Sequence, residues 1–289
     1  MNRSILPLLF LLASLSGGDL PAQKLKILWQ ITENLDSPES AYVDPRSGFL
    51  FLSQIGGSGR EKDGRGWISK LTTDGHWVEE KWITGLNAPK GLRSHGDTLW
   101  VSDIDRIVGM KISSGKIIHD VPVPGAKFLN DLACGPDGTV YVADMIASRI
   151  YAYREGKLSI FAEGERMESP NGLLVHDGKL YVAAWGFTDD FNPTTPGRLF
   201  SLDLKTKKKT LITRQPTGNL DGLEIDRCGD FFVTDWKAGK LFYIRKNGEA
   251  KVIYQGKNGE ADHAYLRESD TIIIPQMLEK KLTAYRVIK

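Results

Sequence analysis

The sequence has little cysteine: Cys134 and Cys228 are the only two in 289 residues. At most one disulfide can form, which excludes a small scaffold held together by several of them. The two cysteines fall in the third and fifth of six repeats, described below, which are not neighbours in a closed ring. Because a disulfide requires Cα atoms within about 7 Å of each other, we predict two free thiols.

Long runs of one charge are also missing, and the net charge is only +2. The densest basic cluster, at residues 205–209, stands where a hairpin turn is expected, so we interpret it as a solvated turn and expect no nucleic-acid partner. The glycine-rich residues 56–59 lack the Gly-Lys-Ser/Thr ending of a phosphate loop. No Gly-x-Ser-x-Gly motif is present, which argues against a serine-triad hydrolase.

The sequence has one marked apolar run, and it lies at the N-terminus. Arg3 is followed by an apolar stretch from Ile5 to Leu15 and then by small and turn-forming residues. This is the form of a secretory signal peptide, and the stretch is too short to cross a bilayer as a mature helix. We predict that residues 1–22 are a signal peptide and that residues 23–289 form one domain. The mature protein is then expected to be periplasmic or secreted, without stable insertion into a membrane.

The sequence does contain a repeated five-residue unit, clearest as Ser-Pro-Asn-Gly-Leu at residues 169–173. The unit recurs in altered form five more times, with successive gaps of 51, 40, 41, 50 and 41 residues. A period of about 40 residues is typical of four-stranded propeller blades, and six copies would close one ring. The third position of the unit, which we call the ring position, is polar in every copy. It is occupied by Glu39, Lys90, Asn130, Asn171, Asp221 and Asp262.

Strand-like runs follow each unit in the same order. The third repeat shows them at residues 130–134, 139–143, 149–153 and 158–162, separated by turn signals such as Gly-Pro-Asp-Gly. The last repeat ends one strand short, while residues 25–32 form an orphan strand before the first repeat. We therefore predict an all-β, six-bladed β-propeller with four-stranded blades, its last blade closed by the N-terminal strand.

The two longest repeats carry insertions at the same junction. Both fall between the second and third strands, at residues 54–66 and 185–197. This junction lies on the face where the ring positions start, so both insertions are expected to overhang the mouth of the central channel. Loops on a rigid scaffold commonly carry specificity, but these two contain no known motif that would name a substrate.

The ring positions offer the chemistry of a metal site. Glu39, Asn130, Asn171 and Asp221 supply only oxygen donors, which favour Ca²⁺, Mg²⁺ or Mn²⁺ over zinc. A divalent cation would also offset the repulsion between carboxylates that converge in a narrow channel. The alternative is that these residues are turn formers at the starts of blades, since Asn and Asp before Gly are common in turns.

Other polar residues receive structural interpretations. Asp103, Asp144 and Asp235 end second strands and are expected to accept hydrogen bonds from neighbouring loop backbone. His263 follows a ring position and could carry a proton, but a hydrogen-bonded structural histidine is the favoured interpretation.

With these motifs, the chain resembles the senescence-marker-protein (regucalcin)/gluconolactonase family of six-bladed, calcium-dependent propellers. The resemblance rests on Glu39 in Glu-Ser-Ala, Asn171 in Pro-Asn-Gly and Asp221 in Asp-Gly, and it implies that these three residues bind the metal. Asn130, followed by Asp131, resembles the substrate-side Asn-Asp pair of the family. Ala41 stands where the family has proline.

Two functions from different classes follow. The first is calcium-dependent hydrolysis of a lactone or related ester, in which the resemblance makes Asp221 the catalytic base. Asn130 would then orient the small-molecule substrate, and Lys90 would hold an anionic or hydroxylated group of it. The second is a non-catalytic exported propeller that binds a ligand or a protein partner with the same face.

Overall fold

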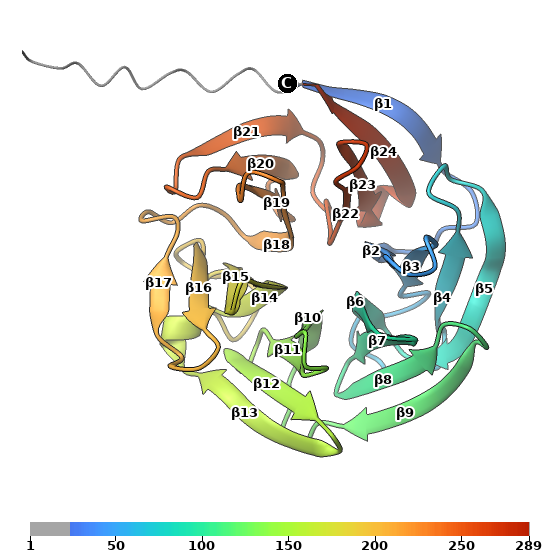
Figure 1. The fold of residues 1–289 in the computed structure, drawn as a ribbon, viewed down its shortest axis with the longest axis horizontal. Coiled ribbons are helices and arrows are strands. Elements are labelled where there is room, and N and C mark those ends of the chain that lie inside the picture. The colour runs from blue at the N-terminus through green and yellow to red at the C-terminus, as the bar shows by residue number, and fades with distance from the viewer. Residues whose placement is uncertain (1–23, 289) are drawn as a thin grey trace, which may run out of the picture.

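The computed structural model describes residues 24–288, which form six four-stranded antiparallel sheets arranged as a ring (Figure 1). The predicted all-β, six-bladed propeller is thereby confirmed. The described residues contain no helix longer than three residues, since only the 3₁₀ turns η1 (Glu165–Met167) and η2 (Met277–Glu279) occur. No helix in this part of the chain has the length and hydropathy needed to cross a membrane.

Within each blade the strands run in chain order from the channel outwards, except in the last. Blade 1 contains β2 (Pro38–Val43), β3 (Leu50–Gln54), β4 (Gly66–Leu71) and β5 (Trp77–Leu86), and blade 2 contains β6 (Pro89–His95), β7 (Thr98–Asp103), β8 (Arg106–Lys111) and β9 (Lys116–Pro122). Blade 3 contains β10 (Leu129–Cys134), β11 (Val140–Asp144), β12 (Arg149–Arg154) and β13 (Lys157–Glu163), and blade 4 contains β14 (Pro170–His176), β15 (Lys179–Ala184), β16 (Leu199–Asp203) and β17 (Lys209–Leu211). Blade 5 contains β18 (Leu220–Ile225), β19 (Phe231–Asp235), β20 (Lys240–Ile244) and β21 (Ala250–Gln255), and blade 6 contains β22 (Ala264–Leu266), β23 (Thr271–Gln276), β24 (Lys281–Ile288) and β1 (Lys24–Ile31).

The ring closes through its N-terminal strand, as predicted. Strand β1 pairs antiparallel with β24 from Lys24 opposite Ile288 to Ile31 opposite Leu282, so it forms the outer strand of blade 6. On its other side Trp29 donates a hydrogen bond from Nε1 to the carbonyl of Thr73 in blade 1, at 3.2 Å. The first strand therefore links the last blade to the first.

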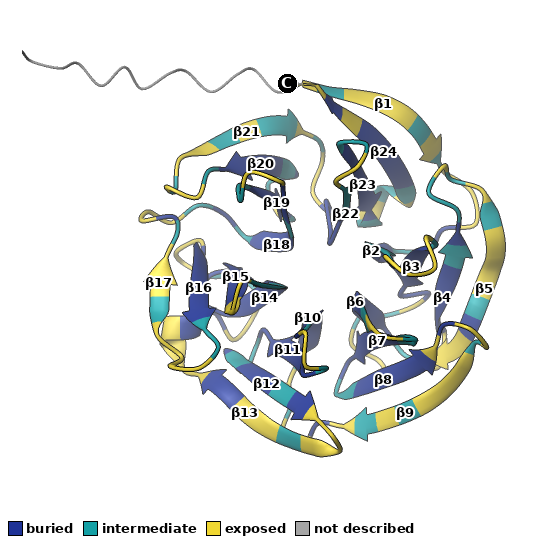
Figure 2. Cartoon of the chain, viewed as in Figure 1, coloured by how far each residue is buried: buried dark blue, intermediate teal, exposed yellow. Residues whose placement is uncertain are grey.

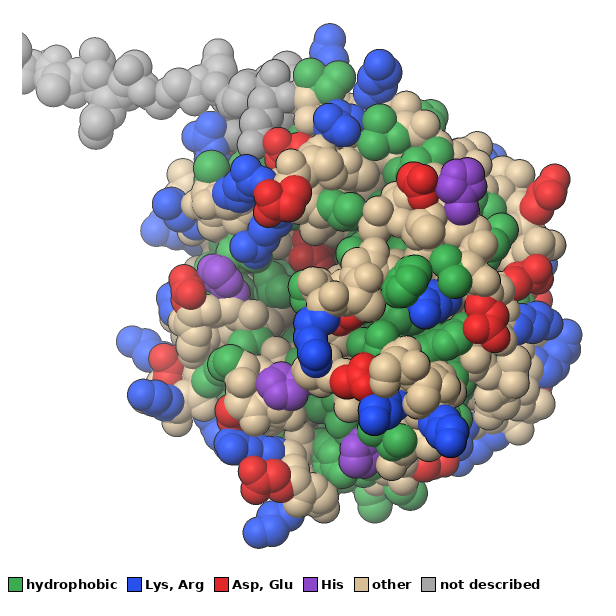
Figure 3. Space-filling view, turned by 45° about the vertical axis from the view of Figure 1, so that its right-hand side comes forward, with side chains coloured by type: hydrophobic (Ala, Val, Ile, Leu, Met, Phe, Trp, Pro, Cys, Tyr) green, Lys and Arg blue, Asp and Glu red, His purple; other side chains and the backbone are tan. Residues whose placement is uncertain are grey.

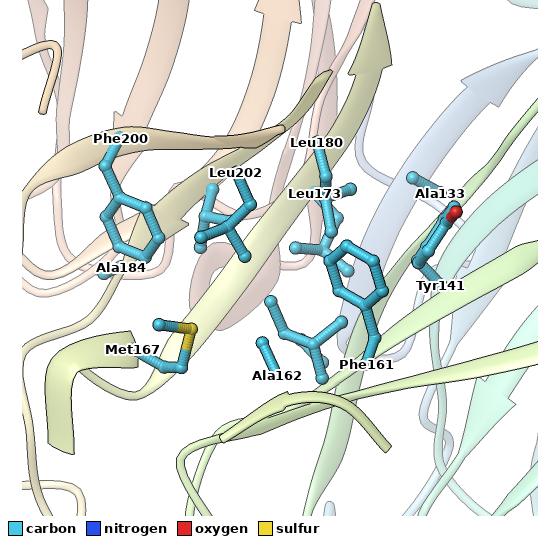
Figure 4. Packing of buried hydrophobic residues seen from close by; sticks show 13 residues of the cluster. Ala133, Tyr141, Phe161, Ala162, Met167, Leu173, Leu180, Ala184, Phe200 and Leu202 are labelled. Carbon is cyan, nitrogen blue, oxygen red and sulfur yellow. The ribbon is translucent and has the colours of Figure 1, made fainter. Parts of the chain in front are cut away.

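The core lies between neighbouring blades. Inner strands are almost wholly buried, whereas the outermost strands are largely exposed (Figure 2). Figure 4 shows one such layer between blades 3 and 4, which contains Phe161 and Tyr141 from blade 3, Leu173 and Phe200 from blade 4, and the buried Met167. Because burying one large apolar side chain contributes about 1.5–3 kcal/mol, these layers fix the angle of each blade and hence the position of its inner strand.

Three further predictions concern the cysteines, the distribution of charge and the N-terminal segment. Both cysteines are free, as predicted, and burial raises the pKa of the Cys134 thiol to about 12. Acidic and basic side chains are intermixed on the face seen in Figure 3. The predicted signal peptide, residues 1–22, lies outside the described residues.

Candidate functional site

The ring positions lie at the start of the inner strands, at an irregularity that five blades share. Each of these five strands pairs regularly with its neighbour except for a register shift across the ring position. Such β-bulges re-aim a side chain relative to the regular pleat and are common beside functional sites. The shifts enclose Glu39, Lys90, Asn130, Asn171 and Asp221.

The third and fourth residues of the unit do not act as turns in the two copies with Asn-Gly and Asp-Gly. Asn171-Gly172 lies inside β14 and Asp221-Gly222 lies inside β18, so the alternative of blade-start turns is wrong. The glycines serve close packing of the inner strands instead. A Cβ at Gly222 would lie 2.6 Å from Nδ1 of His263, which belongs to the next blade.

Three ring residues present oxygen atoms that are buried and without a hydrogen-bond partner. They are Oε2 of Glu39, Oδ1 of Asn130 and Oδ1 of Asn171, which come from three different blades. Buried polar atoms are nearly always paired, so three such oxygens in one region need a physical explanation. The Asn171 amide group is held by donation from Nδ2 to the carbonyl of Leu220, at 3.2 Å.

Asp221 is the fourth ring residue of this region, and its pKa is shifted in the same direction as that of Glu39. Burial, reinforced by the charge of Asp221, raises the pKa of Glu39 well above its ordinary value. Burial also raises the pKa of Asp221 well above its ordinary value, aided by Asp262 and Asp131 and opposed by a hydrogen bond from Asn171. The ionised carboxylates are therefore costly here without a cation.

Lys90 is buried beside these acids. Burial lowers the pKa of Lys90 to about 8, although Glu39 acts in the opposite direction. Its Nζ donates to the carbonyl oxygens of Ala88 at 3.0 Å and Gly59 at 3.3 Å. Two of the three donors of the Lys90 ammonium group are therefore used by backbone carbonyls.

The sixth ring residue, Asp262, is held by side chains from two other blades. Asp262 accepts a hydrogen bond from Oγ of Ser40 at 2.5 Å and forms an ion pair with Arg93 at 3.1 Å. Arg93 also approaches Glu224 at 3.5 Å and is itself buried. Although burial works to lower it, the pKa of Arg93 is raised by the carboxylates of Asp262, Asp131 and Glu224. The carboxylate of Asp262 is therefore engaged within the channel.

The interactions of Arg93 with Asp262 and Asp131 are not evident from the sequence. Asp131 accepts hydrogen bonds from the backbone of Leu132 and Leu173, each at 2.7 Å, and so ties blade 3 to blade 4. Burial raises its pKa well above the ordinary value. The available signal was position, because Asp131 and Arg93 follow ring residues by one and three positions along strands that enter the channel.

His263 contradicts part of its prediction. It is fully buried, but neither ring nitrogen has a hydrogen-bond partner among the described residues. Burial lowers the pKa of His263 to about 4, so the ring is neutral at pH 7. It is a structural histidine, as favoured, but not a hydrogen-bonded one.

The strand-end aspartates hold the backbone that leads into the ring positions, as predicted. They are Asp103, Asp144 and Asp235. Asp103 accepts from the backbone N–H of Ala88 at 2.7 Å, and Asp144 accepts from that of Phe128 at 3.0 Å. Asp235 accepts from the N–H of Ala238 at 2.9 Å. Asp103 and Asp144 thus fix the chain two residues before Lys90 and Asn130. Asp235 also accepts a hydrogen bond from the backbone of Asn219, two residues before Asp221.

A pocket of about 460 Å³ opens over these groups. Both predicted insertions overhang it, as Ser58 to Arg60 line it from the first and Asp190 to Asn192 from the second. The floor includes four ring residues, and the walls are largely apolar and aromatic. The apolar lining residues are Ile55, Phe128, Met145, Trp185, Phe191, Trp236 and Met277.

The fold resembles that of solved protein structures at low sequence identity. A gluconolactonase from Xanthomonas campestris is 14% identical, with a TM-score of 0.68 over 93% of this chain and 96% of the other. A catalytically inactive virginiamycin B lyase from Staphylococcus aureus, solved with quinupristin, is 16% identical, with a TM-score of 0.63 over 92% of this chain and all of the other. A Bacteroides thetaiotaomicron protein of unknown function is 11% identical, with a TM-score of 0.68 over 92% of this chain and 76% of the other.

These similarities establish the propeller fold alone. No protein-family model matches the chain, and no curated protein matches it. The chemistry of this chain must therefore be argued from its own residues.

Proposed function

We propose that this protein is a divalent-metal-dependent hydrolase of a lactone or related ester, with Ca²⁺ as the preferred metal. The observation that carries the proposal is the set of three buried oxygens without partners, on Glu39, Asn130 and Asn171, around the buried carboxylate of Asp221. A hard cation would satisfy such oxygens and offset the repulsion between the two carboxylates.

The donor set fits calcium better than a transition metal. Residues 24–288 contain no group of three or more His, Cys, Asp or Glu side chains placed to hold a metal. Two carboxylates and amide oxygens are, however, ordinary ligands of calcium, which accepts neutral oxygen donors. Glu39, Asn171 and Asp221 would hold the ion, and Asn130 would lie beside it.

The bound cation would supply a Lewis acid that polarises the substrate carbonyl. Asp221 would accept the proton of the attacking water. Because a bound cation lowers the pKa of a carboxylate, Asp221 would be a weak base, which suits a lactone or an activated ester better than an amide. The Asn130 side chain would orient the substrate by hydrogen bonding. Lys90, with one donor not used by backbone, would hold an anionic or hydroxylated group.

Export forms a separate part of the proposal. The apolar run from Ile5 to Leu15 supports cleavage of a signal peptide within residues 1–22 and a periplasmic or secreted protein. N-terminal sequencing of the protein from its native cells tests this, and an intact Met1 on cytoplasmic protein contradicts it.

Thermal unfolding with added calcium or with a chelator tests the metal site. Calcium at 100 times its dissociation constant should stabilise the fold by about 2.7 kcal/mol and so raise the melting temperature. Asp221→Ala should abolish this effect. Asp190→Asn is the matched control, because this carboxylate lines the same pocket but already accepts hydrogen bonds from Thr188 and Asn192. No calcium effect on the parent contradicts the proposal.

Turnover separates the two functional classes. A panel of aldonolactones and aryl esters, assayed with calcium and with chelator, should contain members hydrolysed only with calcium. Calcium binding without turnover of any member would favour the alternative, an exported propeller that binds a small ligand or protein partner with this face.

A further inference from the structure

Three cations line the pocket, and within residues 24–288 none of them is paired with a carboxylate. They are Arg60, Lys90 and Lys237. Lys237 donates to the amide oxygen of Asn192 at 3.0 Å, and Lys90 donates to backbone carbonyls. By contrast, Lys62 in the same insertion as Arg60 does not line the pocket and is paired with Asp105 at 2.5 Å. No ion pair within the described residues therefore offsets the charges of Arg60, Lys90 and Lys237 in the pocket.

Each of these cations lies against an aromatic ring. The guanidinium carbon of Arg60 is 4.1 Å from the centre of the Phe191 ring, and Nζ of Lys90 is 4.6 Å from that of Phe128. Nζ of Lys237 is 5.7 Å from a ring centre of Trp185. A cation held over a ring keeps its charge, because the ring attracts it without neutralising it. The pairs therefore present positive charge beside an apolar surface.

The position of the Phe191 ring is fixed by the backbone conformation and contacts of its loop. Its backbone adopts a left-handed conformation with φ of 69°, which is uncommon for a bulky residue. The carbonyl of Phe191 accepts a hydrogen bond from Nε1 of Trp185 at 3.2 Å, and its ring meets that of Phe128 edge-on at 4.9 Å. This conformation holds an aromatic ring from the second insertion against Arg60 from the first.

The walls suit an apolar ligand body better than a sugar. A sugar lactone would need a hydrogen-bond partner for each hydroxyl group that it buries. Above the floor the pocket offers few neutral polar side chains, chiefly Ser58 and Asn192. The carboxylate of Asp190 is already engaged by Thr188 and by the backbone of Asn192.

Charge balance favours a negative ligand. The lining holds three cations against the three carboxylates of Glu39, Asp190 and Asp221. One divalent ion at the proposed metal site would leave an excess of two positive charges. A concave, partly apolar site strengthens such a field and concentrates anions.

We infer that the pocket takes lactones or esters whose body is apolar and aromatic and carries a carboxylate away from the reacting carbonyl. This inference rests on the proposed function for the reacting group. The aromatic walls bind the body, and Arg60 and Lys237 at the mouth bind the carboxylate.

Binding of compounds that do not react tests the inference apart from catalysis. Calorimetry with 2-naphthoate, 2-naphthamide and gluconate compares an aromatic anion, its neutral analogue and a hydroxylated anion, all with saturating calcium. Naphthoate should bind about tenfold more tightly than either of the others, the factor expected from about 1.4 kcal/mol. Equal binding of naphthamide, or tighter binding of gluconate, overturns the inference.

Variants locate the effect. The double substitution Arg60→Met, Lys237→Met should reduce the preference for naphthoate over naphthamide to about twofold or less, whereas Lys62→Met should leave it unchanged. Both changed cations lie in exposed loop positions, so the fold should be retained. A preference that survives the double substitution but disappears in Asp221→Ala would mean that the carboxylate binds at the metal site, and would overturn the inference. Charge discrimination without any ester turnover would leave the inference standing and contradict only the proposed hydrolysis.

Discussion

Gly172 in blade 4 lies so close to Asp221 in blade 5 that a Cβ at position 172 would overlap the backbone carbonyl oxygen of Asp221. The glycine therefore lets two inner strands approach, and this approach brings Asn171 next to Asp221. The two residues of the Asn-Gly pair therefore have complementary roles. Asn171 places its amide oxygen in the candidate site, and Gly172 leaves room for the backbone of the neighbouring blade.

We expect Gly172→Ala to destabilise the fold by about 3 kcal/mol, because the added carbon meets backbone that cannot rotate away. Denaturant unfolding measures the change. Gly59→Ala is the matched control, since the nearest atom to its Cβ would be a side-chain carbon of Ile55 at 3.9 Å. Equal stability of the two variants would contradict this account of the glycine.

Kinetics should distinguish Asp221 from Lys90. If Asp221 accepts a proton in the rate-limiting step, Asp221→Asn should lower kcat by about 10²–10⁴-fold. Lys90→Met removes a binding contact, so it should mainly raise KM, by about tenfold, with little change in kcat. The measurement uses whichever ester of the panel the parent hydrolyses. Parental activity in Asp221→Asn would eliminate this mechanism.

Arg93 should be among the residues most important for stability. Arg93→Met would leave Asp262 and its neighbours buried without a cation, and breaking a buried pair in this way costs about 3–5 kcal/mol. Arg154→Met is the control, because its partner Asp137 is about half exposed and exposed pairs contribute about 0–1 kcal/mol. Similar losses in the two variants, measured by urea unfolding, would contradict a central role for Arg93.

Closure by β1 can be tested by moving the strand. Deleting residues 24–31 should abolish cooperative unfolding, because blade 6 then ends in an open edge at β24. Since Lys24 lies opposite Ile288, a circular permutant that joins these ends by a short turn should restore the transition. A deletion variant that melts like the parent would show that closure is not required.

Much of this fold could be predicted from the sequence because its information is periodic. The ring units recur at blade spacing, and the missing last strand matched the orphan strand at residues 25–32. The residues proposed to bind a metal could be selected for the same reason, since Asn171 and Asp221 occupy equivalent positions in neighbouring blades.

The groups that contact one another across the channel could not be predicted in this way. Arg93 and Asp262 are 169 residues apart, and nothing in the local sequence of either shows that they meet. The pairing of Arg60 with Phe191 likewise depends on the course of two insertions that have no repeat to compare with. The position of Asp262 in its repeat could be read from the sequence, but its contacts with Ser40 and Arg93, which come from two other blades, could not.

His263 gives the last prediction, and its sign follows from linkage. Its pKa in the folded protein is about 4, below the ordinary value of about 6.5, so between these values the unfolded chain binds more protons. This residue alone should therefore make the fold less stable by about 2–3 kcal/mol as the pH falls from 7 to 4.5.

His263→Leu removes that contribution, and because neither ring nitrogen has a partner among the described residues, it should cost little at pH 7. Urea unfolding of the parent and the variant at pH 7 and 4.5, with the same calcium concentration, measures the difference in pH dependence. The same pH dependence in both proteins would show that His263 is already protonated, or already paired, in the folded state.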